Sequence, residues 1–254
     1  MTNLIDLTDK HILIIGASSG IGRQTALTLS SLGARLTLVA RTEEKLKTVI
    51  SELDGKDHAY LLFDVTDLTG TEAMVKQVVE RNGRLDGLVY SVGITMSMPL
   101  HMYKPEKLQK VFNVNFFAFV ECVRQAAKKG RFNPGMRIVG ISSIASMKGD
   151  KTHLGYSSSK AAMDAAVRCM AKELADKEIY INTVAPGMTD TGMLSNFKGN
   201  VGDDSDSLKE LLERQYLGVI KPEAVAETVA FLLSRSAESI TGITLPVDGG
   251  MTTC

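Results

Sequence analysis

A glycine-rich turn, GASSGIG at residues 16–22, is the feature that most constrains how this chain folds. It directly follows the apolar run His11–Ile15, and a helical pattern of apolar residues leads from it to Gly33. A strand, a glycine turn and a helix in this order are typical of a loop that binds a diphosphate at the amino terminus of the helix. The alternative is a tight strand-to-helix turn that binds no ligand.

Each glycine of the turn has a physical purpose in a diphosphate loop. Gly16 permits the tight turn, Gly20 lets the backbone approach the diphosphate, and Gly22 lets the helix pack closely on the strand. The helix then presents free N–H groups and the positive end of its dipole to the phosphates. The turn as a whole supplies candidate cofactor contacts at Gly16, Ser18, Ser19, Gly20, Ile21 and Gly22.

The second predicted strand, Arg35–Ala40, ends at Arg41 and indicates which dinucleotide binds. A carboxylate at this strand end would bind the 2′-hydroxyl of the adenosine ribose, whereas an arginine accommodates a 2′-phosphate. The residue directly before Arg41 is Ala40 rather than an acid, and the Ser18 and Ser19 hydroxyls could assist Arg41. We therefore expect NADP to be preferred over NAD. The alternative is an exposed arginine before the cap and acidic first turn of the next helix.

Strands and helices alternate along the rest of the chain. This order predicts an α/β protein with a doubly wound parallel sheet in three α/β/α layers, and 254 residues suit one domain, residues 1–254. Ligands of such sheets bind outside the carboxyl ends of the strands. The further predicted strands are 58–63, 85–91, 136–141, 179–184 and 243–247, and the polar or glycine positions after them include Asp64, Gly93 and Ser143. Asp64 could bind the adenine amino group or serve as a turn residue.

Two segments do not follow the simple alternation. The helix predicted over 106–130 carries Asn113 and Asn115 among apolar residues, and a buried mid-helix asparagine needs partners or marks a kink. Residues 188–220, with a short helix at 208–216, have no steady periodicity around a polar tract. We interpret that segment as a mobile loop over the substrate.

A tyrosine and a lysine four residues apart, Tyr156 and Lys160, lie in a predicted helix from Gly155 to about Asp176. Side chains at this spacing share one helix face, and an ammonium beside a phenol lowers the phenol pKa. Tyr156 is therefore a candidate general acid or base, with Ser143 close by at a strand end. The alternative is an ordinary polar helix face.

Composition limits the classes of function. Lysine plus arginine equals aspartate plus glutamate, 29 each, so no overall basic field indicates nucleic acid. Three dispersed cysteines form neither a disulfide framework nor a metal-binding motif. The amino-terminal residues lack an export signal, and no apolar run is long enough to span a membrane. We expect a cytoplasmic protein without a metal site.

The order of these motifs and the distances between them match a known pattern. Over its whole length the chain resembles the short-chain dehydrogenase/reductase family, which has a single-domain Rossmann fold. The resemblance is closest to members that are similar to 3-oxoacyl-(acyl-carrier-protein) reductases. The segments that carry it are residues 16–22, Asp64-Val65, Asn115, Ser143, Tyr156 with Lys160, residues 186–191 and residues 241–250.

The resemblance implies roles for a catalytic tetrad. Tyr156 would protonate the carbonyl oxygen as hydride arrives, and Lys160 would lower its pKa and bind the nicotinamide ribose. Ser143 would orient the carbonyl, and Asn115 would hold a water that links Lys160 to solvent. The implied cofactor contacts also include Asp64, Val65, Ser91, Val92, Gly93, Tyr156, Lys160, Pro186, Gly187, Thr189 and Thr191, with the last two holding the carboxamide.

The segment after the fourth strand departs from the family pattern. Family members commonly have Asn-Asn-Ala-Gly there, whereas this chain has Tyr90-Ser91-Val92-Gly93. The hydrogen bonds that those asparagines make must therefore be replaced or lost.

The leading hypothesis is an NADPH-dependent reductase of a ketone, either a small molecule or a 3-oxoacyl thioester. The alternatives are a dinucleotide-binding regulatory protein without turnover, and an epimerase or dehydratase. Methionines near the predicted strand ends could line an apolar pocket or pack on the core. Lys128, Lys129 and Arg131 could bind an acidic carrier protein or simply be a solvated helix end. A homo-oligomer, tetramer or dimer, is also expected, packed through small residues of the Tyr156 helix.

Overall fold

A seven-stranded parallel sheet forms the centre of the molecule. The computed structural model describes residues 4–195 and 212–253. The strand order is β3-β2-β1-β4-β5-β6-β7, and every neighbouring pair is parallel, which confirms the doubly wound sheet. The strands are β1 (His11–Ile15), β2 (Arg35–Ala40), β3 (Ala59–Leu62), β4 (Leu85–Tyr90), β5 (Phe132–Ile141), β6 (Tyr180–Pro186) and β7 (Thr244–Val247).

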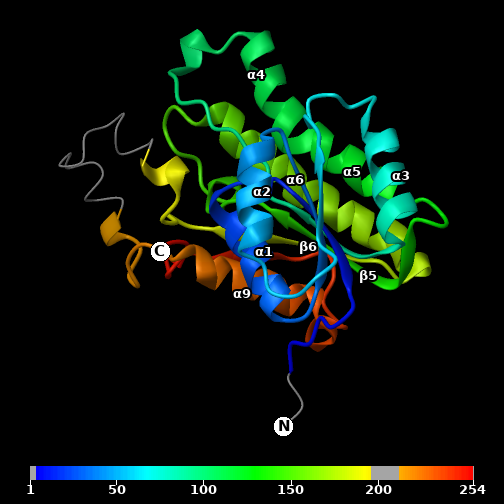
Figure 1. Ribbon diagram of the computed structural model, residues 1–254. Coiled ribbons are helices and arrows are strands. Elements are labelled where there is room, and N and C mark those ends of the chain that lie inside the picture. The colour runs from blue at the N-terminus through cyan, green and yellow to red at the C-terminus, as the bar shows by residue number, and fades with distance from the viewer. Residues whose placement is uncertain (1–3, 196–211, 254) are drawn as a thin grey trace.

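Helices cover both faces of the sheet and complete the three layers (Figure 1). One face carries α1 (Gly20–Ser31), α2 (Glu43–Ser51) and α9 (Pro222–Leu233). The other carries α3 (Thr71–Asn82), α4 (Pro105–Phe112), α5 (Ala118–Ala126) and α6 (Leu154–Leu174). Short helical turns are η1 (Leu100–Met102), η2 (Asn113–Phe117), η3 (Ile144–Ser146), η4 (Ala175–Lys177) and η5 (Arg235–Ala237).

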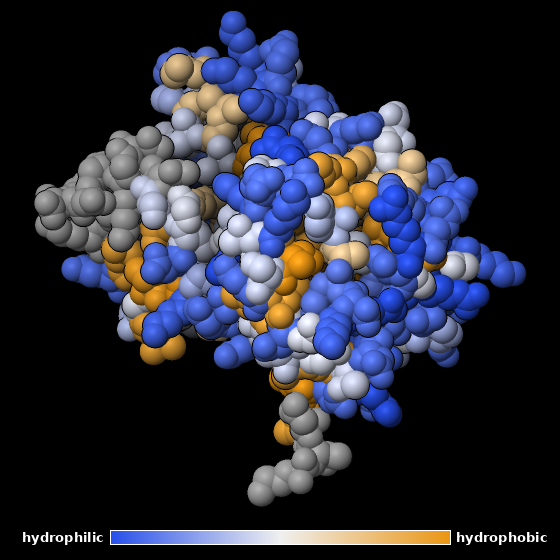
Figure 2. All heavy atoms as spheres, viewed as in Figure 1, coloured by the Kyte–Doolittle hydropathy of each residue, from blue (hydrophilic) through white to orange (hydrophobic). Residues whose placement is uncertain are grey.

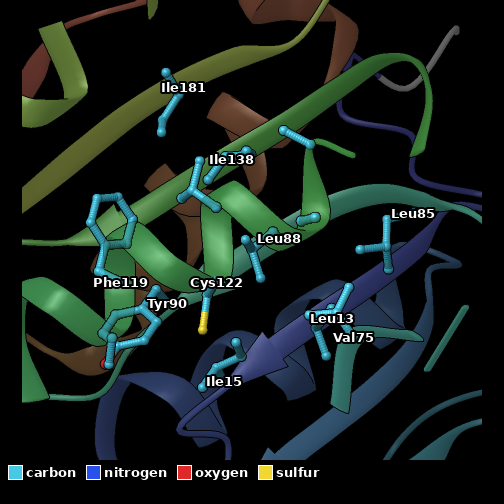
Figure 3. Close-up of a cluster of buried hydrophobic side chains, with 14 of the residues drawn as sticks. Leu13, Ile15, Val75, Leu85, Leu88, Tyr90, Phe119, Cys122, Ile138 and Ile181 are labelled. Atoms are coloured by element: carbon cyan, nitrogen blue, oxygen red, sulfur yellow. The ribbon is translucent and has the colours of Figure 1, made fainter. Parts of the chain in front are cut away.

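The alternation of side chains along the strands builds two cores. In β1, Leu13 and Ile15 face the layer of α3, α5 and α6, while Ile12 and Ile14 face the layer of α1, α2 and α9. Figure 3 shows the first of these cores, where strand side chains meet Val75 of α3 and Phe119 and Cys122 of α5. Burial on both faces explains why the β1 sequence is one continuous apolar run.

Most predicted boundaries agree closely with the structure. The first two strands have the predicted limits. The long helix predicted over 106–130 is instead interrupted: α4 passes through the π-helical turn η2 before α5 begins at Ala118. The asparagine pair lies in that turn and thus marks the interruption of the helix.

The predicted loop over 188–220 is described only at its two ends. Residues 196–211, which include the first part of the helix predicted at 208–216 (residues 208–211), lie outside the described residues. The two described ends meet through a parallel bridge between Thr189 and Ile220. The Asp190 amide donates to the Ile220 carbonyl at 2.9 Å, and the Ile220 amide donates to the Met188 carbonyl at 2.9 Å.

The surface that carries α1 and α2 is mostly hydrophilic, with smaller hydrophobic patches between charged side chains (Figure 2). Within the described ranges, no helix combines the length and the apolarity that a bilayer crossing requires.

Candidate active site

The glycine turn between β1 and α1 is shaped so that only glycine fits at its key positions. Gly16 has a φ of +92°, and a Cβ there would lie 2.8 Å from Val92 Cγ2. A Cβ on Gly22 would overlap the Gly16 carbonyl oxygen. Ser19 caps α1 without a side-chain hydrogen bond to the first turn, so the amide groups at the helix start are not capped by it. A diphosphate fits this cradle, because those amides can bind it.

The other face of the turn meets the segment after β6. A Cβ on Gly20 would lie 3.6 Å from Thr191 Cγ2, in ordinary van der Waals contact. Two sets of predicted cofactor contacts that are far apart in the sequence therefore border the same space. Ile21 packs on the core beneath the turn, so its side chain is structural.

Arg41 and Asp64 lie together at the carboxyl ends of β2 and β3. Arg41 Nη1 is 3.6 Å from Asp64 Oδ2, and the Arg41 side chain is 75% exposed. Asp64 Oδ1 accepts hydrogen bonds from the amide and hydroxyl of Thr66 at 2.9 and 2.8 Å. The Thr66 amide is the main cause of a lowered Asp64 pKa. Asp64 thus closes a turn through Oδ1, while its contact with the adenine stays a prediction, and Val65 beside it is buried in the core.

Tyr156 and Ser143 come together from α6 and from the end of β5. Burial raises the pKa of the Tyr156 phenol above its ordinary value, and a hydrogen bond with the Ser143 hydroxyl partly offsets this. The lowered Tyr156 pKa predicted from the sequence is therefore wrong for this structure. The reason is that burial of the phenol outweighs the hydrogen bond from Ser143, the neighbour that lowers the pKa.

Lys160 is buried one helical turn after Tyr156, with 3% of its surface exposed. Its ammonium donates to the Ile141 carbonyl at 2.6 Å. Burial lowers the Lys160 pKa to about 8, and Asp164 on the next turn opposes this shift. An ammonium with this pKa can release a proton close to neutral pH. Gly93 packs directly against it, because a Cβ on Gly93 would lie 3.4 Å from Lys160 Nζ.

Asn115 is fully buried in η2, and every polar atom of its side chain has a partner. Its Oδ1 accepts from the Ile94 amide at 2.9 Å, and its Nδ2 donates to the Ile94 carbonyl at 3.0 Å. The same Nδ2 donates to Ser159 Oγ at 2.9 Å. Ser159 Oγ in turn donates to the Tyr156 carbonyl at 2.7 Å. The four predicted catalytic residues therefore converge on one site, although Asn115 does not bond Lys160 directly.

The segment from Pro186 to Thr191 follows β6 and is held by Gln215, a residue that the sequence analysis missed. Gln215 Oε1 accepts from the Met188 amide at 2.8 Å, and its Nε2 donates to the Met188 carbonyl at 3.0 Å. Only 2% of Gln215 is exposed. No motif in the sequence marks this residue, since its partner lies across the predicted loop.

Tyr90 was also missed as a functional candidate. It is fully buried at the end of β4, and its hydroxyl donates to the Val114 carbonyl at 2.5 Å. It thus supplies one hydrogen bond where the family pattern has an asparagine. Ser91 and Val92 after it pack against the glycine turn. A signal was present, because a polar tip at the end of an apolar strand usually has a partner.

Two of the three basic residues considered for a carrier protein share one carboxylate. Lys128 Nζ and Arg131 Nη2 both contact Glu72 Oε1, at 2.7 and 3.0 Å. They lie just before β5 begins, so within one subunit they border the opposite end of the sheet from Ser143. Both the carrier-protein surface and the solvated helix end stay predictions for these residues. Among the residues that the structure describes, no cluster of His, Cys, Asp and Glu could hold a metal ion.

Comparisons with known proteins agree with this geometry. A family model described as enoyl-(acyl carrier protein) reductase matches residues 16–252. L-xylulose reductase of Caenorhabditis elegans is 33% identical over 248 residues, which cover 96% of this chain and 96% of that protein. The 3-oxoacyl-(acyl-carrier-protein) reductase FabG of Staphylococcus aureus is 33% identical over 251 residues, 95% of this chain and 98% of that protein.

A solved structure adds a likeness in three dimensions. A variant of the actinorhodin polyketide ketoreductase, crystallised with NADPH, matches with a TM-score of 0.88 and 30% identity, covering 97% of this chain and 98% of the other. Both the sequence matches and this structural match extend over nearly the whole chain. The chain therefore belongs to the short-chain dehydrogenase/reductase family and is an NAD(P)-dependent oxidoreductase that resembles the 3-oxoacyl-(acyl-carrier-protein) reductases.

Proposed function

We propose that this protein is an NADPH-dependent reductase that converts a ketone into a secondary alcohol, with Tyr156 as the proton donor. The observation that carries the proposal is the convergence of Tyr156, Ser143 and a buried Lys160 beside the glycine turn. Bound NADPH supplies the hydride. The raised pKa of Tyr156 suits this direction, because it keeps the phenol protonated until the carbonyl oxygen gains negative charge.

Each residue of the tetrad then has a defined task. Tyr156 gives its proton to the carbonyl oxygen, while the Ser143 hydroxyl bonds the same oxygen and orients it. Lys160, with a pKa of about 8, returns a proton to the tyrosinate. Asn115 fixes the backbone at Ile94 and, through Ser159, the start of α6.

We propose a ketone with an apolar arm, a 3-oxoacyl thioester being the first class to test. Met188 packs with Ile144, directly after Ser143, in a small apolar cluster. Met147 and Met193 are 48% and 43% exposed near these elements. Flexible thioethers suit an acyl chain better than a polyhydroxylated sugar, which needs hydrogen-bond partners. The relatives named for 3-oxoacyl, polyketide and xylulose substrates share a ketone as the reacting group.

The test is NADPH oxidation with 3-oxoacyl thioesters of increasing chain length, simple ketones and L-xylulose. Wild-type enzyme should reduce the longer thioesters best, and Tyr156→Phe should lower kcat by about a thousandfold while NADPH still binds. NADPH binding without turnover of any substrate would instead favour a non-catalytic dinucleotide-binding protein. Preference for L-xylulose would overturn the substrate class alone.

The preference for NADP is proposed from Arg41, whose exposed guanidinium lies at the end of β2 with Ser18 and Ser19 on the neighbouring turn. Arg41→Ala should weaken NADPH binding by about tenfold or more and leave NADH binding nearly unchanged, because only NADPH carries a 2′-phosphate. Fluorescence titration with both dinucleotides measures this. Equal losses of affinity for NADPH and NADH would contradict the proposed role of Arg41.

We also propose a homo-oligomer, a tetramer or dimer, with α6 at the subunit contact. Ala161, Ala162 and Ala165 present small side chains along this helix, and Ala165 is exposed. Small residues let two helices approach closely. Sedimentation equilibrium would reveal a monomer if this is wrong.

A further inference from the structure

We propose that Tyr90 is a positioning residue, whose buried hydroxyl completes the π-helical turn that places Asn115 in the active site. The catalytic part of this inference rests on the proposed function, whereas its structural part does not. Tyr90 lies at the end of β4, and Asn115 lies on the neighbouring helical segment η2.

The first step concerns the backbone of η2. In a regular α-helix the Ala118 amide would donate to the Val114 carbonyl, four residues earlier. Here it donates to the Asn113 carbonyl, five residues earlier. The Val114 carbonyl thus loses its regular partner, and the Tyr90 hydroxyl donates to it at 2.5 Å. A side chain of the sheet therefore supplies the donor that the helix backbone gave up.

The second step concerns the hydroxyl itself. Tyr90 is fully buried, and its ring packs edge-on against Phe119 with centroids 5.6 Å apart. Figure 3 shows the ring beside Phe119 and Cys122 in the apolar core. Phenylalanine would fill this space equally well, so packing does not require the hydroxyl. Burial raises the Tyr90 pKa well above its ordinary value, which keeps the group a neutral donor.

The third step leads from the turn to the site. Inserting one residue into a helix turns every following side chain by about 100°. The extra residue in η2 therefore decides which side chains face inward, and Asn115 is one of them, bonded to Ile94 and Ser159. Ser159 lies between Tyr156 and Lys160 on α6 and bonds the Tyr156 carbonyl. Loosening η2 should thus disturb the positions of both catalytic side chains.

The test is Tyr90→Phe, which removes the hydroxyl and keeps the ring. We expect kcat to fall about tenfold, a shifted pH profile, and a KM for NADPH within about twofold of wild type. Amide hydrogen exchange over residues 113–118 should also become faster. Phe119→Leu serves as the control, because it weakens the same core but leaves the Tyr90 hydroxyl in place. It should lower the melting temperature without moving the pH profile.

A double-mutant cycle decides whether Tyr90 acts through Asn115. On an Asn115→Ala background, Tyr90→Phe should lower kcat little further. Equal losses in both backgrounds, or an unchanged pH profile and unchanged exchange in Tyr90→Phe, would overturn the inference. A wild-type enzyme that reduces no ketone would overturn the proposed function instead. In that case the exchange comparison between Tyr90→Phe and Phe119→Leu, at equal stability, still decides whether the hydroxyl holds η2.

Discussion

At the scale of single residues, the charge on Lys160 depends on its buried neighbour Asp164. Only 5% of Asp164 is exposed, and its Oδ1 accepts from Thr183 Oγ1 at 2.8 Å. The Asp164 carboxylate favours the charged ammonium against the desolvation that lowers the Lys160 pKa to about 8. Asparagine at this position could still accept from Thr183, so the substitution changes charge more than hydrogen bonding.

Asp164→Asn should therefore lower the Lys160 pKa further, since one stabilising charge is removed. If the protonated ammonium is needed, the high-pH limb of kcat moves to lower pH, and kcat at pH 8 falls about two- to threefold. A profile of kcat against pH measures this. The exposed Asp176 on η4 provides the control, and Asp176→Asn should leave the limb in place. If the high-pH limb of kcat stays at the same pH in Asp164→Asn, the Lys160 ammonium does not determine that limb.

The tetrad could be recognised from the sequence because its members lie at fixed separations after strands or along one helix. The protonation of Tyr156 could not, since it depends on how deeply the site is buried rather than on the spacing to Lys160. Partners such as Tyr90 with Val114 were equally hidden. Their contact joins a strand to a helix 24 residues away, and it exists only once α5 packs on β4.

At the scale of elements, the segment after β6 is held by its backbone bridge to Ile220 and by one buried side chain, Gln215. Gln215 bonds both the amide and the carbonyl of Met188, and its Nε2 also donates to the Gly218 carbonyl at 2.5 Å. It thereby joins the two described ends of residues 188–220 beside Thr189 and Thr191. The segment that we expect to hold the carboxamide therefore depends on a residue outside its own sequence motif.

Gln215→Leu keeps the approximate volume and removes these hydrogen bonds. The Met188 amide loses its partner, whereas the Met188 carbonyl keeps the Ile220 amide. The unpaired amide should cost about 1–3 kcal/mol of unfolding free energy and weaken NADPH binding about three- to tenfold. Urea unfolding and NADPH titration measure the two effects. Leu217→Ser is the matched control, because Leu217 is 84% exposed and bonds Gly249 only through its backbone. Wild-type affinity for NADPH in Gln215→Leu would show that the pairing does not support the cofactor site.

The element boundaries show where sequence patterns suffice. β1 and β2 were predicted to the residue because both strands are buried runs closed by a glycine or a charge. The break of the long helix into α4, η2 and α5 was not predicted, although the asparagine pair marked a possible kink. The apolar spacing through 106–130 is that of a continuous helix, and the donor that stabilises the π-helical turn comes from the sheet.

At the scale of the whole molecule, one end of the parallel sheet carries the proposed active site and the other carries a buried network that supports the fold. The proposed cofactor and catalytic residues lie after the carboxyl ends of the strands or, like Asn115, Tyr156 and Lys160, on helices that pack there. The amino ends are held by a buried network around His11 at the start of β1, with 1% of this histidine exposed. Its Nδ1 lies 2.9 Å from the Gly83 carbonyl, and its Nε2 lies 2.8 Å from Thr37 Oγ1. The Gly83 carbonyl can only accept, so Nδ1 carries the proton in the neutral ring.

This network should make stability depend on pH without involving the active site. Burial and the charge of Arg35 lower the His11 pKa below 6.5, and the opposing effects of Asp86 and the backbone carbonyls are smaller. As pH falls below about 6.5, the unfolded chain therefore takes up a proton that the folded chain does not, and stability decreases. His11→Gln should remove this pH dependence. The loss of unfolding free energy that it removes is about 1.4 kcal/mol for each unit by which folding lowers the His11 pKa. Urea unfolding between about pH 5 and pH 8 measures the slope.

The exposed His101 supplies the control, since His101→Gln should keep the wild-type slope. If His11→Gln also kept it, acid sensitivity would have to arise elsewhere, whereas unchanged kcat at neutral pH would confirm that the two ends of the sheet are independent.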